Sequence, residues 1–137
     1  MNILKWNEEK MGLGIEIIDE QHKKLLNIIN KLMFSILNNN QKKDICSIVD
    51  ELANYIEYHF KTEEALFQDI NHQDIINHKK EHDNFRDKIF TISENLKNDK
   101  KEIYKDSIET LSDLFKFMAK WFANHVIHSD RLLLTHI

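Results

Sequence analysis

Hydrophobic residues recur at spacings of three and four along four long stretches of the chain, as they do on one face of an amphipathic helix. From this pattern we predict helices at about residues 19–37, 42–69, 72–97 and 102–134, after an extended arm over residues 1–18. The chain has no proline and only two glycines, Gly12 and Gly14, so nothing interrupts long helices after residue 15. Short polar connections favour antiparallel neighbours. The pattern predicts an all-α protein, an antiparallel up-down-up-down four-helix bundle.

Histidines and carboxylates replace apolar residues on the stripes that would face the bundle core. They fall early in the first and third predicted helices and late in the second and fourth, which an up-down-up-down bundle places at the same end. His59 with Glu63, and His78 with His82, are four residues apart and therefore share a helix face. The full set is His22, His59, Glu63, His78, His82, His125 and Asp130.

Burying these histidines and carboxylates would destabilise the fold unless a cation compensated them, because each buried polar group without a partner costs several kcal/mol of folding free energy. Mixed imidazole and carboxylate donors suit iron, with zinc, copper or manganese as alternatives. Seven ligands are too many for one ion and about right for two, with the carboxylates bridging. The residues therefore predict a buried site for a pair of metal ions.

The third helix also permits a different interpretation. Its sequence His78-Lys79-Lys80-Glu81-His82 matches the H-x-x-E-H pattern of an inverted zinc peptidase with Glu81 as the base, although the other five ligands would then be unexplained. The Glu-x-x-His motif of carboxylate-rich di-iron bundles is missing, since no histidine has a glutamate three residues before it.

The composition of the chain argues against several classes of protein. A chain of 137 residues fits a single domain, here 1–137, and its charged fraction of 31% is typical of a soluble globular protein. A net charge of -4 gives no electrostatic reason to bind nucleic acid. Cys46 is the only cysteine, so no internal disulfide can form. No apolar run reaches the length of a signal peptide or membrane span, and we expect a cytoplasmic protein with no membrane association.

Five segments carry a resemblance to a known family. They are Trp6, then Gly14-Ile15 with Ile18-Asp19-Glu20-Gln21-His22, then His59-Phe60-Lys61-Thr62-Glu63-Glu64, then His78-Lys79-Lys80-Glu81-His82-Asp83-Asn84-Phe85, and last Trp121-Phe122-Ala123-Asn124-His125 with Asp130. Together they resemble the hemerythrins, specifically the single-domain bacterial hemerythrins, over essentially the whole chain.

The resemblance implies a di-iron centre, with two iron ions per chain and a bridging oxide or hydroxide. It assigns His78, His82 and His125 to one iron and His22 and His59 to the other. Glu63 and Asp130 would bridge the two. One coordination position then remains free on the iron with two histidines, where the resemblance implies that dioxygen binds.

Reversible binding requires a dry pocket beside that position. Candidates for its lining lie three or four residues from a ligand, where ordinary core packing explains them equally well; they are Ile18, Leu25, Leu26, Ile56, Trp121 and Phe122.

Other polar residues are expected outside the ligand set. His128, three residues after His125, competes with Asp130, but a second carboxylate completes the ligand count and Asp130 is preferred. Asp130 lies five residues after His125, about 140° around a regular helix, which implies a distorted helix or a long reach. His72 and His136 are expected to be exposed. Asp19 and Glu64 are expected either to support the ligands from behind or to lie at the surface, and the surface is preferred.

The resemblance implies reversible dioxygen binding, for storage, delivery or sensing, rather than enzymatic turnover. The alternative is a di-iron enzyme that reduces peroxide, nitric oxide or dioxygen at the same site, because both activities begin with a reduced iron pair and an open position. Dioxygen is the expected partner, and the sequence identifies no partner protein.

Overall fold

The computed structural model describes residues 4–38, 42–98 and 106–136, and within these ranges every regular element is helical. The elements are α1 (Glu8–Met11), α2 (Glu16–Leu37), α3 (Lys42–Leu66), α4 (Gln73–Asn98), α5 (Asp106–Asn124), the π-helical segment η1 (His125–Asp130) and α6 (Arg131–Leu134).

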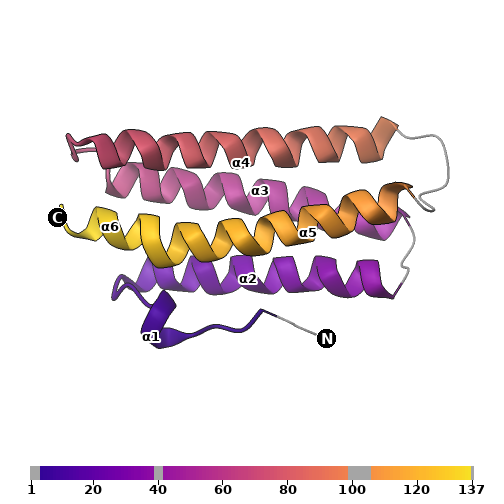
Figure 1. Cartoon of the computed structure of the whole chain (residues 1–137), viewed down its shortest axis with the longest axis horizontal. Coiled ribbons are helices and arrows are strands. Elements are labelled where there is room, and N and C mark those ends of the chain that lie inside the picture. Colours follow the sequence, from indigo (N-terminus) through magenta and orange to yellow (C-terminus); the bar gives the residue numbers. More distant parts are fainter. Residues whose placement is uncertain (1–3, 39–41, 99–105, 137) are drawn as a thin grey trace.

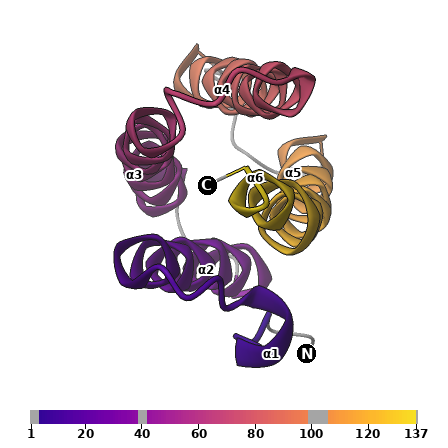
Figure 2. The ribbon, with the colours of Figure 1, turned by 90° about the vertical axis from the view of Figure 1, so that its left-hand side faces the viewer.

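Four long rods form an antiparallel bundle, and the predicted all-α architecture is confirmed (Figure 1). The fourth rod consists of α5, η1 and α6 in succession. Seen from its end, the bundle has α2, α3, α4 and the fourth rod around a square, with α1 outside it beside α2 (Figure 2). Because neighbouring rods run in opposite directions, the starts of α2 and α4 and the ends of α3 and α5 lie at one end, together with the C-terminus.

Apolar side chains from all four rods fill the interior between them. Leu25, Leu52, Phe85 and Leu114 are each at most 1% exposed, as the periodicity predicts. The same spacing of apolar residues predicts burial of Leu66 late in the second helix, and there it is wrong, because Leu66 is 43% exposed while the next residue, Phe67, is fully buried. The buried stripe continues at Phe67, four residues after Glu63, whose backbone carbonyl accepts the N–H of Phe67 at 2.9 Å, and Leu66 lies to one side of this stripe.

The arm before α2 is shorter and more ordered than predicted. Its helix α1 begins after Asn7, whose side chain accepts the backbone N–H of Lys10 at 3.1 Å. Gly14 turns the chain into α2 with a φ of 79°, a conformation that favours glycine. The carboxylate of Asp19 accepts the backbone N–H groups of Leu13 and Gly14 at 2.9 and 3.1 Å. Asp19 is therefore a buried anchor for the arm, and its predicted surface position is wrong.

The helix ends differ from the predicted bounds by a few residues. Helix α3 ends at Leu66 rather than 69, and α4 begins at Gln73, where Nδ1 of His72 accepts the backbone N–H of Asp74 at 3.1 Å. The predicted start of the last helix, 102–105, lies outside the described residues.

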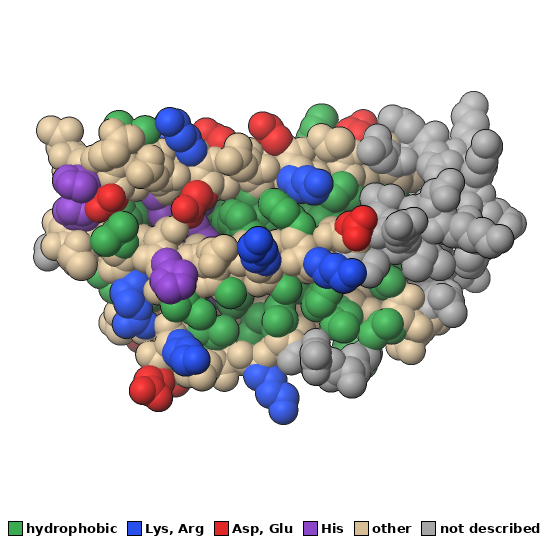
Figure 3. All heavy atoms as spheres, viewed as in Figure 1, with side chains coloured by type: hydrophobic (Ala, Val, Ile, Leu, Met, Phe, Trp, Pro, Cys, Tyr) green, Lys and Arg blue, Asp and Glu red, His purple; other side chains and the backbone are tan. Residues whose placement is uncertain are grey.

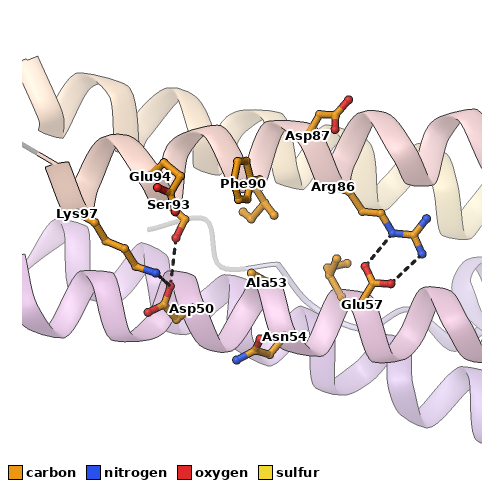
Figure 4. Close-up of a pocket in the computed structure, with 12 residues that line it drawn as sticks. Asp50, Ala53, Asn54, Glu57, Arg86, Asp87, Phe90, Ser93, Glu94 and Lys97 are labelled. Carbon is orange, nitrogen blue, oxygen red and sulfur yellow. Dashed lines mark hydrogen bonds and ion pairs between the residues drawn. The ribbon is translucent and has the colours of Figure 1, made fainter.

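A groove of about 640 Å³ lies between α3 and α4, away from the predicted ligands (Figure 4). Ion pairs cross it at both ends, from Arg86 to Glu57 at 2.8 Å and from Lys97 to Asp50 at 3.3 Å. These contacts join the two helices on their outer side. None of the described helices is long and apolar enough to cross a membrane.

Candidate metal centre

All seven predicted ligands meet at the end of the bundle where the C-terminus lies. Helix α2 contributes His22, α3 contributes His59 and Glu63, α4 contributes His78 and His82, and η1 contributes His125 and Asp130. Each is at most 2% exposed.

The first of two donor groups consists of three histidines and one carboxylate. Nitrogens of His78, His82 and His125 and an oxygen of Glu63 all lie within 4.8 Å of one another. The three imidazole rings have centroids 4.2 to 4.8 Å apart. Phe60 stacks on His82 at 3.8 Å and Trp121 on His125 at 4.4 Å, which fixes the planes of two of these rings.

The second donor group contains two histidines and two carboxylates. Donor atoms of His22, His59, Glu63 and Asp130 also lie within 4.8 Å of one another. Nε2 of His59 is 2.8 Å from Oε1 of Glu63, and Nε2 of His22 is 3.0 Å from Oδ2 of Asp130. The groups therefore differ in composition, with more imidazole in the first and more carboxylate in the second.

The two carboxylates lie between the groups. Glu63 belongs to both sets of converging donors. Asp130 directs Oδ1 toward Nε2 of His78 at 2.6 Å and Nε2 of His125 at 3.0 Å, and its Oδ2 faces His22. Each carboxylate can thus contact a cation on either side of it.

The π-helical segment η1 explains the spacing of His125 and Asp130. A π-helix closes its turn with a bond from residue i to residue i+5, so residues five apart face the same way. Both residues lie within η1 and both are buried, whereas His128 between them is exposed. Of the two explanations that the sequence spacing left open, the structure shows the distorted helix, and His128 takes no part in the cluster.

The donor atoms are arranged to bind a metal ion rather than to form hydrogen bonds with one another. Several buried polar atoms that face the cluster have no hydrogen-bond partner, although they lie close to opposite charges; they are Nε2 of His22, Nε2 of His59, Oε2 of Glu63 and Oδ2 of Asp130. Their short separations without hydrogen-bond geometry mean that they converge on shared space. Imidazole and carboxylate are ligands for iron and similar ions, so the residues present fit such a group.

In the metal-free chain the cluster behaves as a set of mutually stabilised charges. Burial disfavours the charged form of His125, but Asp130 and Glu63 outweigh this effect and raise its pKa well above the usual value. Burial also opposes ionisation of Glu63, yet His59 and His125 hold its pKa well below its ordinary range. At His82 burial prevails and lowers the pKa. The ionised carboxylates of the cluster can therefore bind a metal cation in place of the protons that the histidines hold.

Three histidines of the cluster are held in orientation by hydrogen bonds at Nδ1, the ring nitrogen that faces away from the cluster. Nδ1–H of His82 donates to Oε2 of Glu64 at 2.8 Å, and Nδ1–H of His125 donates to Oε2 of Glu81 at 3.0 Å. Nδ1–H of His59 donates instead to the side-chain oxygen of Gln21 at 2.8 Å. In the neutral imidazole each of these bonds keeps the proton on Nδ1, so that Nε2, which is directed at the cluster, can bind a metal ion; metal-binding histidines are usually held in this way.

Sequence reasoning missed these partners. Glu64 was expected at the surface, but it binds His82 and also accepts from Arg86 at 3.1 Å. Glu81 also accepts a hydrogen bond from the hydroxyl of Ser129 at 2.9 Å, and together these bonds lower its pKa despite partial burial. Glu81 is thus engaged with His125 rather than free to act as a peptidase base. The only available signal was that each glutamate adjoins a predicted ligand in the sequence.

The predicted pocket residues divide between the two donor groups. Phe122 lies edge-on to His22, with ring centroids 6.2 Å apart. Trp121, in contrast, stacks on His125 in the first group. The remaining candidates, Ile18, Leu25, Leu26 and Ile56, are at most 3% exposed.

Comparison with known proteins identifies the family. Residues 13–137 match the model of the Hemerythrin HHE cation binding domain. A protein named Bacteriohemerythrin from Clostridium acetobutylicum is 34% identical over 130 residues, which cover 92% of this chain and 95% of that protein. Another of the same name from Methylococcus capsulatus is 29% identical over 132 residues, covering 96% and 95%.

Solved structures agree with the sequence matches. The crystal structure of wild-type hemerythrin superimposes with a TM-score of 0.82 at 25% identity, over 98% of both chains. The structure of its L114Y mutant gives the same TM-score at 26% identity, over 99% of this chain and 98% of that one. The resemblance inferred from the sequence is confirmed, and the chain belongs to the hemerythrin family of HHE cation-binding domains.

Proposed function

We propose that the chain is a single domain that holds two non-haem iron ions and binds dioxygen reversibly. His78, His82 and His125 would hold one iron, His22 and His59 the other. The observation that supports the pair most directly is the position of Glu63 and Asp130, which lie between two buried donor groups and face both of them.

When bound, a pair of ferrous ions supplies two electrons that dioxygen takes up on binding and returns on release. The protein must keep water and protons away from this exchange, since either would let reduced oxygen escape. Five imidazoles and two carboxylates with almost no exposure, surrounded by apolar side chains, meet this requirement.

The open position should lie on the iron with fewer histidines. With a bridging oxide or hydroxide, the ion held by His78, His82 and His125 would have all its positions filled, and the ion held by His22 and His59 would keep one free. Phe122 faces His22, and we propose that it lines the dioxygen pocket with Ile18, Leu25, Leu26 and Ile56. Trp121 lies against the other group and would support the ring of His125 instead.

The test combines metal analysis with an optical spectrum. The iron-loaded protein should contain two irons per chain, and a visible absorption band should appear under oxygen and vanish under argon through repeated cycles. An Asp130→Ala variant should lose iron and the band, whereas His128→Ala, which removes an exposed neighbouring histidine, should keep both.

Other outcomes would point elsewhere. A single zinc per chain would contradict the iron pair. A band that forms once and decays to ferric protein, with sustained turnover when an electron donor is added, would favour the enzyme that reduces peroxide, nitric oxide or dioxygen.

A further inference from the structure

A third group of metal-type ligands lies outside the buried cluster. His72 immediately precedes α4, Asp74 lies in the first turn of α4, and His136 follows α6. One donor atom from each residue lies within 4.8 Å of the others. Histidine side chains reach the surface toward the end of the molecule where the C-terminus lies (Figure 3). Residues distant in sequence are thus gathered at one accessible point.

The distances within this group suit a small ion. Nε2 of His136 is 2.9 Å from Oδ2 of Asp74, and Nδ1 of His72 is 3.2 Å from the same oxygen. Donor atoms about 2.0–2.1 Å from a tetrahedral zinc ion lie roughly 3.3 Å apart. The two imidazole rings have centroids 4.3 Å apart at an angle of 35°, so one ion can contact both.

The contact between His72 and Asp74 also favours a cation. Nδ1 of His72 accepts the backbone N–H of Asp74 at 3.1 Å, so it has no proton to donate to the carboxylate beside it. Two electron-rich atoms consequently face each other across 3.2 Å. A positive ion bound through Nδ1 of His72 and the carboxylate of Asp74 would replace the hydrogen bond from the backbone N–H and remove this repulsion.

We propose that His72, Asp74 and His136 form a surface site for a divalent transition-metal ion of the zinc class. Two imidazoles and one carboxylate match the preferences of these ions, whereas Mg²⁺ and Ca²⁺ require mostly oxygen ligands. The site does not share a residue with the buried centre. Asp74 precedes His78 by four residues, so the ion would lie one helical turn from that centre and tie the chain beyond α6 to the start of α4.

Zinc chloride titrated calorimetrically into the full, iron-loaded chain tests the proposal, with iron measured before and after. We expect one saturable zinc per chain, no displaced iron, and no binding of Mg²⁺. His72→Ala and His136→Ala should each weaken zinc binding about tenfold or more, because loss of even an outer partner of a ligand costs that much. His128→Ala is the matched control and should bind zinc as the unaltered chain does.

Thermal unfolding gives a second measurement. Zinc should raise the melting temperature of the unaltered chain and leave that of Asp74→Asn nearly unchanged. The proposal is overturned if zinc does not bind saturably, if it binds only by displacing iron, or if the three variants respond like the unaltered chain. Asp74 would then serve only as an ion-pair partner for His136.

Discussion

The two donor groups receive different support from the residues behind them. The carboxylates of Glu64 and Glu81 accept hydrogen bonds from Nδ1–H of two histidines in the first group, whereas the neutral amide oxygen of Gln21 accepts the hydrogen bond from His59 in the second. A carboxylate draws the Nδ1 proton more strongly than an amide does and makes Nε2 a better electron donor. An iron in the first group would therefore be stabilised in its ferric form relative to one in the second.

A Glu64→Gln variant tests this difference. It keeps the size of the side chain but weakens the bond from His82, so the ferric state should lose stability and the reduction potential should rise. A tenfold change in the relative affinity for ferric and ferrous iron corresponds to about 60 mV. Spectroelectrochemical titration of the iron-loaded variant measures the shift.

Glu57→Gln is the matched control for this experiment. Glu57 binds Arg86, as Glu64 does, but touches no histidine of the cluster. The reduction potential of the Glu57→Gln variant should stay near that of the unaltered protein. An equal rise in both variants would mean that the potential responds to surface charge near Arg86 and not to the hydrogen bond of His82.

At the scale of the helices, the sequence was sufficient for the long rods but not for their ends. Periodic apolar residues located the four rods, because burial of one face is what stabilises them. The ends depend on single contacts, such as the carboxylate of Asp19 on the arm and the ring of His72 on α4, which spacing does not reveal. The five-residue gap from His125 to Asp130 did signal a distortion, and η1 supplies it.

The role of η1 can be tested by removing one residue from it. Without the exposed His128, Asp130 would come four residues after His125, and a regular α-helix would place both on one face. We expect the shortened chain to fold, to keep its iron, and to melt no lower than the unaltered protein. Iron analysis and circular dichroism during heating provide the measurements.

A deletion elsewhere in the same rod serves as the comparison. Lys120 is exposed in α5, and its removal would rotate His125 and Asp130 by about 100° relative to the residues before them. That variant should lose iron. Loss of iron from the His128 deletion as well would show that the wide turn itself, and not only the alignment of its two ends, is required.

At the scale of the whole molecule, the position of the buried cluster could be predicted from the directions in which the four helices run. Ligands early in the first and third helices and late in the second and fourth must meet in an antiparallel bundle, and they do. Spacing does not determine the rotation of each helix about its axis. For that reason the sequence could not assign Glu64 to His82 or Glu81 to His125, since each of these contacts joins two different rods of the bundle.

Removal of iron should weaken the whole bundle. A ligand present at a hundred times its dissociation constant stabilises the folded state by about 2.7 kcal/mol, and for a chain of this size that corresponds to a melting temperature roughly 10 °C higher. Differential scanning calorimetry of iron-loaded and chelator-treated protein measures the difference. Equal melting temperatures would mean that the ions contribute nothing to folding.

The difference in melting temperature between iron-loaded and metal-free protein should also grow as the pH rises from about 6 to 8, the range around the ordinary pKa of histidine. In the metal-free chain Asp130 and Glu63 overcome the effect of burial and raise the pKa of His125, so its contribution to stability is complete below the unfolded value and is lost as pH rises through the folded one. His78 acts in the same direction through Asp130, while burial lowers the pKa of His82 and opposes them. Iron binding instead improves as protons leave the imidazoles. Calorimetry at several pH values should therefore show the metal-free melting temperature falling while the iron-loaded one holds or rises.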